Sequence, residues 1–148
     1  MDAHATLTAV DLFVYGTLLF PDVLEALLGR VPAMAPAHAA GWRVAALPGR
    51  LYPGLVAHRQ ATASGMVITG LELGERRLLD AYEDTGYRLT AIDLADGRNC
   101  AAYVWRTAVL AEDWCRRTFA EDHLAGYVER CARWRATCGR PPPPATGG

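Results

Sequence analysis

The sequence predicts an α+β fold in which a small curled mixed sheet or β-barrel is flanked by helices, with a long helix near the C-terminus. Strand-like segments outnumber helical segments along the chain. The helical segments do not alternate regularly with the strands, and no internal repeat or second domain is evident. We therefore expect a single domain over residues 1–140, followed by a Pro/Gly-rich disordered tail at 141–148.

The N-terminal half of the chain shows clear turn signals between short apolar segments. The expected elements are a strand at 10–15, a helix at 21–28, a loop at 31–40, a strand at 42–47 and an irregular stretch at 51–56. Pro21 suits the first position of a helix, and Gly29 is typical of a helix end. The loop at 31–40 is expected because this Pro- and Ala-rich stretch has no periodicity.

The C-terminal half has stronger periodic signals. The expected elements are a strand at 64–72, a helix at 75–83, strands at 87–94 and 99–106, and a long helix at 113–136. Asp96-Gly97 between the last two strands is a strong hairpin signal. Apolar residues from Phe119 to Trp134 keep close to a period of 3.6, which predicts one amphipathic helix.

Composition argues against several classes of function. The net charge is −1 over 148 residues, so there is no bias toward nucleic acid or an anionic membrane. No apolar run is long enough to span a bilayer, and the first residues do not resemble a signal peptide, so we expect a soluble, cytoplasmic protein. None of the cysteines has metal-site spacing: Cys100, Cys115, Cys131 and Cys138. The oligomeric state is not predicted.

The loop after the first strand is a candidate anion-binding site. It consists of Tyr15, Gly16, Thr17 and Leu18. Glycine allows a sharp turn that brings backbone N–H groups close to a ligand, and successive N–H groups near a helix start favour anions such as a carboxylate. An ordinary strand-to-helix turn explains the same tetrapeptide.

The acidic segment from Asp80 to Asp84 is a candidate acid/base site. Asp80 and Glu83 fall on one side of the predicted helix, and Glu83 lies at its end. The negative end of the helix dipole and burial both raise the pKa of a carboxyl group, which suits proton transfer near neutral pH. A solvated acidic helix end is the alternative.

Three further residues could line a pocket. Tyr87 could donate a hydrogen bond to a substrate or pack in the core, and Arg50 and Tyr52 flank a turn whose charge could equally be at the surface. His123 lies in the predicted long helix, where a position at the surface or at the edge of the core is expected. The sequence contains no Gly-x-Ser-x-Gly motif, no P-loop and no Gly-x-Gly-x-x-Gly motif.

Taken together, the order and spacing of these segments resemble the gamma-glutamylcyclotransferase-like superfamily, in particular its AIG2-like branch. The resemblance covers roughly residues 12–134. The segments that carry it are Phe13-Val14-Tyr15-Gly16-Thr17-Leu18, Ala26-Leu27-Leu28-Gly29-Arg30-Val31-Pro32, Leu51-Tyr52-Pro53-Gly54-Leu55-Val56, Leu78-Leu79-Asp80-Ala81-Tyr82-Glu83 and the stretch from Trp114 to Tyr127. Two positions differ from the family pattern: Asp84 stands where glycine often follows the glutamate, and Arg88 is displaced by one residue from the family's Tyr-x-Arg spacing.

The resemblance implies an enzyme that cyclises a gamma-glutamyl amide, peptide or amine to 5-oxoproline and releases an amine. Glu83 is then the catalytic acid/base, and the loop at Gly16 binds the substrate's α-carboxylate, with Arg50, Tyr52 and Tyr87 as further substrate contacts. No metal or organic cofactor is implied, and the partner is a small molecule. The alternative is a non-catalytic module of the same fold that binds a small carboxylate or a partner protein.

Overall fold

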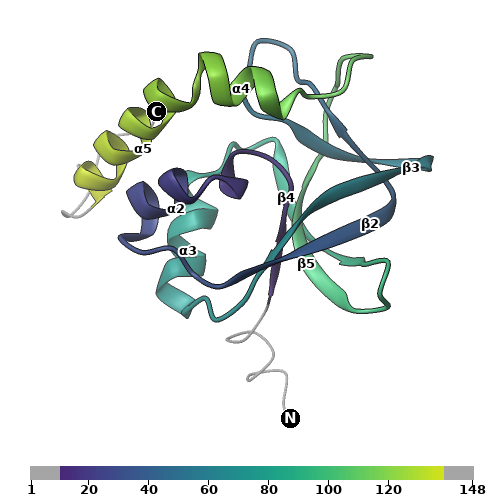
Figure 1. Cartoon of the computed structure of the whole chain (residues 1–148), viewed down its shortest axis with the longest axis horizontal. Helices are drawn as coiled ribbons and strands as arrows, with labels where there is room; N and C mark the ends of the chain where they lie inside the picture. Colours follow the sequence, from purple (N-terminus) through teal and green to yellow (C-terminus); the bar gives the residue numbers. More distant parts are fainter. Residues whose placement is uncertain (1–10, 139–148) are drawn as a thin grey trace.

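The computed structural model describes residues 11–138 of the chain and contains one mixed sheet with helices packed against it (Figure 1). The strands are β1 (Leu12–Val14), β2 (Met34–Ala45), β3 (Gly54–Ile68), β4 (Tyr87–Asp93) and β5 (Asn99–Trp105). The helices are the 3-10 turn η1 (Thr17–Leu19), α2 (Pro21–Leu28), α3 (Leu73–Tyr82), α4 (Arg116–Asp122) and α5 (Leu124–Cys138). Within this range no helix is both long and apolar enough to cross a bilayer. The tail predicted at 141–148 lies outside the described residues.

The sheet is curled because β3 pairs with three other strands, β1, β2 and β5. The strand order is β2-β3-β1-β5-β4, with an additional pairing between β3 and β5 at Leu55 and Val104. β1 runs antiparallel to β3 and parallel to β5. A hydrogen bond of 2.8 Å from the Ala95 N–H to the His38 carbonyl joins the two outer parts of the sheet. The predicted α+β fold with a curled mixed sheet is therefore confirmed.

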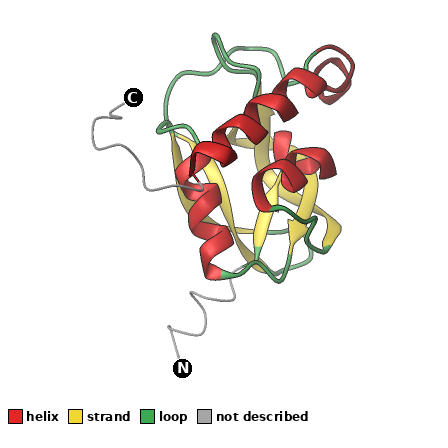
Figure 2. Ribbon diagram, turned by 90° about the vertical axis from the view of Figure 1, so that its left-hand side faces the viewer, coloured by secondary structure: helices red, strands yellow, loops and turns green. Residues whose placement is uncertain are grey.

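Side chains on the two faces of the sheet form two apolar clusters. Phe13 and Tyr15 belong to the cluster inside the curl, whereas Leu12 and Val14 pack toward the helices. This alternation follows from the two-residue period of a strand, and it explains why β1 is buried on both faces. Figure 2 shows the helices covering one side of the strands. The loop that follows β1 therefore emerges between the sheet and the helical layer.

The loop predicted at 31–40 is wrong, because β2 begins at Met34 and runs through the strand expected at 42–47. Among the strands of residues 11–138, β2 pairs with β3 alone and so forms an edge of the sheet, apart from an isolated bridge between Ala45 and Asp113. An edge strand tolerates Pro36, whose missing N–H does not interrupt a second ladder. Gly41, with a φ of 86°, lies at the register shift between Ala40 and Trp42.

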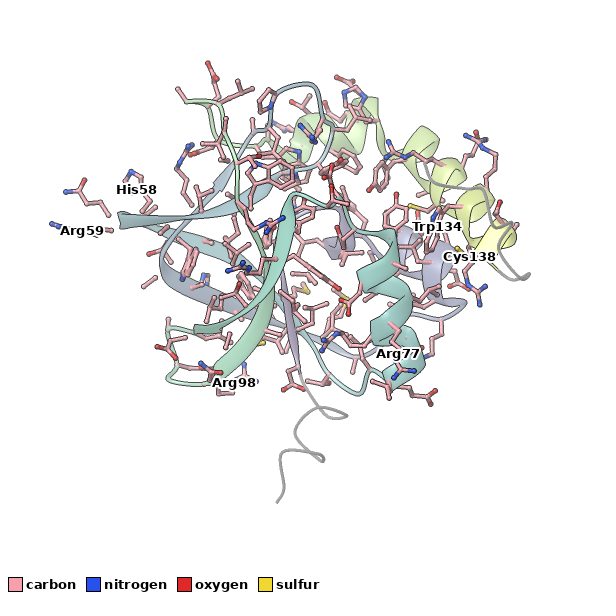
Figure 3. All side chains as sticks on the ribbon, turned by 180° about the vertical axis from the view of Figure 1, so that it is seen from behind. His58, Arg59, Arg77, Arg98, Trp134 and Cys138 are labelled. Atoms are coloured by element: carbon pink, nitrogen blue, oxygen red, sulfur yellow. The ribbon has the colours of Figure 1, made fainter. Side chains whose placement is uncertain are left out.

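The strand predicted at 64–72 begins ten residues later than β3 does and ends four residues after it. β3 begins at Gly54, inside the stretch expected to be irregular, and ends at Ile68. Its middle is polar and exposed, and His58 and Arg59 project at one extremity of the molecule (Figure 3). Backbone pairing with β2 holds this segment in the sheet, so the apolar pattern alone does not reveal it.

The helix predictions succeed where local signals are strong. α2 begins at Pro21 and ends before Gly29, whose φ of 79° is left-handed, as predicted. The hairpin of β4 and β5 is confirmed. The single helix expected at 113–136 is wrong in detail, because a non-helical His123 separates α4 from α5, and α4 begins only after Cys115 caps its N-terminus.

Candidate active site

The loop after β1 is shaped by close backbone packing at Gly16. A Cβ atom at this position would come within 2.6 Å of the Pro53 ring, so only glycine fits without movement. The chain then turns into η1, where the Leu19 N–H donates to the Gly16 carbonyl over 2.9 Å. The N–H groups of Thr17 and Leu18 donate to no carbonyl within residues 11–138. They are therefore available to a ligand.

Glu83 reaches the same region from the end of α3. Its backbone N–H donates to the Leu79 carbonyl over 3.1 Å, and its extended backbone conformation ends the helix. A small cavity lies between Glu83 and the β1 loop. The lining residues are Phe13, Val14, Tyr15, Gly16, Thr17, Leu18, Pro53, Glu83, Tyr87 and Tyr103. Glu83 and the residues that carry the free N–H groups thus border one small cavity.

The carboxyl group of Glu83 has an unusual protonation equilibrium. Burial raises its pKa to about 8, and the negative charges of Asp80 and Asp84 act in the same direction. No hydrogen bond to the charged form offsets these effects among the described residues. At neutral pH this group is therefore mostly protonated, and its conjugate base is much stronger than an ordinary carboxylate.

The tyrosines beside Glu83 are fixed by hydrogen bonds to the backbone. Tyr15 donates its hydroxyl to the Tyr103 carbonyl over 2.6 Å, and Tyr87 donates to the Pro53 carbonyl over 2.5 Å. Burial raises the pKa of both hydroxyl groups, so they stay protonated at neutral pH. They form a rigid wall of the cavity.

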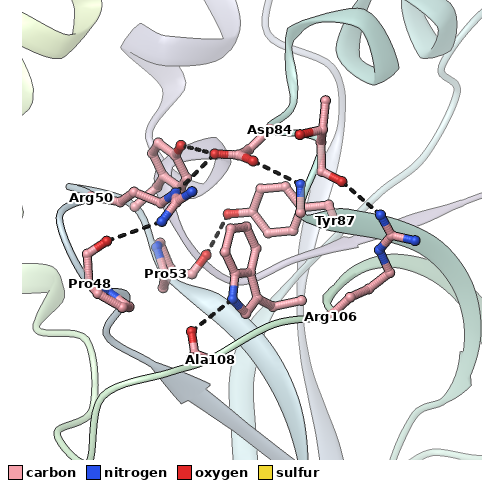
Figure 4. Close-up of polar contacts among 11 residues, drawn as sticks. Pro48, Arg50, Pro53, Asp84, Tyr87, Arg106 and Ala108 are labelled. Carbon is pink, nitrogen blue, oxygen red and sulfur yellow. Dashed lines mark hydrogen bonds and ion pairs between the residues drawn. The ribbon is translucent and has the colours of Figure 1, made fainter.

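Asp84 makes a separate polar cluster on the other side of the same turn (Figure 4). Its carboxylate accepts hydrogen bonds from Arg50 Nε over 3.0 Å, from the Gly86 N–H over 2.8 Å and from the Tyr52 hydroxyl. Burial alone would raise the pKa of Asp84, but these bonds and the Arg50 charge outweigh burial and lower it. The guanidinium of Arg50 also stacks on Trp105, with its central carbon 4.9 Å from the ring centroid.

The structure brings together six of the eight residues predicted for the site. Tyr15, Gly16, Thr17, Leu18, Glu83 and Tyr87 line one cavity. Arg50 does not reach it and instead lines a cleft beside α4 that includes the exposed His123. Tyr52 borders a third opening, which Glu83 also lines.

Several residues of this region were not found by sequence reasoning. Pro53 and Tyr103 line the cavity, although one was read only as a turn residue and the other as part of a strand. Tyr103 also donates its hydroxyl to Asp80 over 2.5 Å, which links the helix to β5. A pattern of apolar and aromatic residues cannot distinguish such contacts from ordinary packing. Within residues 11–138, no group of His, Cys, Asp and Glu side chains could hold a metal ion.

Comparison of the sequence with known proteins identifies its family. Residues 12–121 match the model of the family described as "Gamma-glutamyl cyclotransferase, AIG2-like". The chain belongs to this family. It is 34% identical to AIG2-like protein C of Arabidopsis thaliana over 66% of the chain and 60% of that protein. It is 29% identical to AIG2-like protein D over 84% of the chain and 88% of that protein.

Solved structures agree with this assignment at the level of the fold. A solution structure of an Arabidopsis thaliana protein matches 96% of the chain and all of that protein, with a TM-score of 0.64 and 25% identity. A structure named gamma-glutamyl cyclotransferase matches with a TM-score of 0.56 over 95% of this chain and 92% of the other, but at 14% identity. This second likeness concerns the fold alone. The family and fold that the sequence resembles are thus confirmed.

Proposed function

We propose that this AIG2-like family member is a cofactor-independent cytoplasmic enzyme that cyclises a gamma-glutamyl amide to 5-oxoproline and releases an amine. One observation carries the proposal: a carboxyl group with a pKa of about 8 borders the same cavity as the free N–H groups of the β1 loop. Family membership supports this reaction class, because the family is described as gamma-glutamyl cyclotransferase.

The reaction is an intramolecular aminolysis. The α-amine of the glutamyl group attacks its own γ-carbonyl carbon, so one C–N bond forms and closes a five-membered ring. The C–N bond to the leaving amine then breaks. Because nucleophile and electrophile belong to one molecule, the enzyme mainly has to hold the reactive conformer and move protons.

The β1 loop would supply the grip on the substrate. The N–H groups of Thr17 and Leu18 are free to donate to the substrate's α-carboxylate, and Gly16 lets the backbone approach closely. The wall formed by Tyr15 and Tyr87 would limit rotation of the glutamyl chain. Such a fixed carboxylate places the α-amine and γ-carbonyl within the small cavity.

Glu83 would carry the proton between the two nitrogens. The α-ammonium cannot attack until it loses a proton, and a carboxylate with a raised pKa accepts that proton more readily than an ordinary one. The resulting carboxylic acid then donates a proton to the departing nitrogen. The ring nitrogen then gives up its second proton to the regenerated Glu83 carboxylate, which passes it to the released amine. Two protons thus move from the α-nitrogen to the leaving nitrogen, and Glu83 returns to its carboxylate form.

The test is release of 5-oxoproline from a panel of gamma-glutamyl amides, peptides and amines by the purified protein. Replacing Glu83 by glutamine (Glu83→Gln) keeps the side chain's size and is expected to lower kcat/KM by about 10²–10⁴-fold, or about 3–5 kcal/mol. Asp80→Asn is the matched control, since this carboxylate already binds Tyr103 and Arg76. Turnover of Glu83→Gln within a few-fold of wild type would reject the role of Glu83.

The alternative is a binding module that uses the same cavity without turnover. Asp84, which stands where the family pattern often has glycine, is the feature that distinguishes this chain. Tight binding of a gamma-glutamyl compound without 5-oxoproline release, equally strong in wild type and Glu83→Gln, would favour the module.

A further inference from the structure

Glu83 also lines a second cleft. This cleft is lined by Tyr52, Tyr82, Glu83, Asp84, Tyr127 and Arg130. Glu83 is the residue that this cleft shares with the smaller cavity at the β1 loop. The two spaces therefore share the residue that would handle the protons.

The proposed reaction fixes which part of a substrate would occupy each space. The glutamyl α-carboxylate at Thr17 and Leu18 takes the smaller cavity, and the amide nitrogen must lie beside Glu83 to receive a proton. Groups beyond that nitrogen then extend away from the β1 loop. The cleft between α3 and α5 is the second space that Glu83 lines, so it can receive these groups.

The charges around this cleft are unequal. The Asp84 carboxylate is already bonded to Arg50, Tyr52 and the Gly86 N–H, so its negative charge is compensated. Glu83 is mostly neutral at pH 7 because burial raises its pKa to about 8. The cleft thus has little uncompensated negative charge.

Arg130 supplies positive charge without a carboxylate partner. Its guanidinium lies over the Tyr127 ring, 5.3 Å from the centroid, and forms no ion pair within residues 11–138. By contrast, Arg133 one turn later on α5 pairs with Glu129. Stacking on Tyr127 restricts the Arg130 side chain, and a planar guanidinium suits bidentate binding of a carboxylate.

We propose that the cleft holds the leaving group and that Arg130 binds a carboxylate on it, so that the substrate is a gamma-glutamyl amino acid or peptide rather than a simple gamma-glutamyl amine. This inference rests on the proposed function for its catalytic meaning. It depends on Tyr52, Tyr82 and Tyr127 as the walls of the cleft and on Arg130 as its cation.

The kinetic test compares gamma-glutamyl-alanine with gamma-glutamyl-alaninamide, which differ only in the terminal carboxylate. Wild type is expected to prefer the carboxylate by roughly five- to tenfold in kcat/KM, because Arg130 is exposed and its ion pair is weaker than a buried one. Arg130→Gln should abolish that preference mainly by raising KM. Arg133→Gln, a change on the same helix, should leave it intact.

Calorimetric titration of both compounds into Glu83→Gln separates this inference from the proposed reaction. Tighter binding of the carboxylate form, lost in the double variant Glu83→Gln/Arg130→Gln, supports the cleft even if wild type shows no turnover. Equal binding of both compounds, or equal losses for both in Arg130→Gln, would overturn it. Binding of neither compound would reject the cleft and the substrate class together.

Discussion

Glu83 and Asp84 are adjacent carboxyl residues at the end of α3, yet their environments differ in almost every respect. The Glu83 group faces a cavity, has no hydrogen bond within the described residues and has a pKa raised to about 8. The Asp84 group accepts three hydrogen bonds, one of them from Arg50, and has a lowered pKa. Two adjacent residues therefore differ in role: the carboxyl group of Glu83 is suited to proton transfer, and that of Asp84 is suited to joining neighbouring segments by hydrogen bonds.

The two groups depend on each other through the loop that contains Pro53. Asp84 holds Arg50 and Tyr52 at one end of this loop, and Tyr87 binds the Pro53 carbonyl. Pro53 in turn packs against Gly16 and lines the cavity that Glu83 faces. The ionised Asp84 therefore helps to shape the site in which the neighbouring Glu83 stays protonated.

The largest expected effect that separates Glu83 from Asp84 is the pH dependence of turnover. Because the base form of Glu83 is required, kcat/KM should fall about tenfold for each pH unit below its pKa of about 8. Asp80 contributes to the raised pKa through its negative charge. The acidic limb in Asp80→Asn should therefore move to lower pH, measured as 5-oxoproline release from pH 5 to 9.

Two outcomes would contradict this assignment. A flat profile between pH 5 and 8 would mean that no group with the expected pKa controls the reaction. A limb that stays in place in Asp80→Asn would mean that the controlling group is not close to Asp80.

A smaller effect, on the free energy of unfolding, should have opposite signs at the two positions. The folded-state pKa of Glu83 lies above its unfolded value of about 4.3, so protonation stabilises the fold at low pH and this contribution is lost as pH rises toward 8. Glu83→Gln should therefore gain stability relative to wild type between pH 5 and 9. Asp84→Asn should lose about 1–2 kcal/mol at pH 7 through its weakened bonds.

The pH dependence of the Asp84 loss provides the internal control. The folded-state pKa of Asp84 is lowered, so its contribution is complete above the unfolded value of about 3.9 and is lost only as pH falls further. Urea unfolding of wild type and both variants at pH 5, 7 and 9 should thus show a constant deficit for Asp84→Asn and a growing gain for Glu83→Gln. Parallel curves for the two variants would remove the distinction.

Local signals in the sequence were enough to predict much of the fold. Pro21 and Gly29 predicted both ends of α2, and Asp96-Gly97 predicted the hairpin of β4 and β5. These predictions succeed because the determining chemistry lies within a few residues: a fixed φ, a left-handed cap and a tight turn.

Elements that depend on pairing between distant segments could not be predicted in the same way. The strands predicted at 42–47 and 64–72 cover only the ends of β2 and β3, because the first part of β2 contains proline and small residues and the middle of β3 is polar. Each is held by the ladder that it forms with the other. The break at His123 is similarly invisible, because the apolar period continues through it.

The residues of the candidate site likewise divide into those predicted from local segments and those that depend on distant contacts. The Gly16 loop and Glu83 each stand in a recognisable local segment, and the structure brings them to one cavity. Arg50 and Tyr52 flank a turn and both bond to Asp84, and only Tyr52 borders an opening that Glu83 also lines. Arg130 was not singled out, since an arginine on the polar side of a helix is ordinary until the cleft beside it is known.

The smallest expected effect on turnover and stability is that of replacing Arg88. Tyr87 and Arg88 are neighbours on β4, and they repeat the contrast between a side chain that faces the site and one that points outward. Tyr87 lines the cavity, whereas Arg88 pairs with Val104 in the ladder and is exposed. Since adjacent strand residues point to opposite faces, Arg88 should not contact a substrate in the cavity. Arg88→Ala should change the free energy of unfolding by less than about 0.5 kcal/mol and kcat/KM by less than about twofold. Tyr87→Phe, which loses the bond to Pro53, is the paired control and should have the larger effect on both. A tenfold loss of turnover in Arg88→Ala would mean that β4 presents its other face to the substrate, and the assignment of Tyr87 to the wall of the site would fail with it.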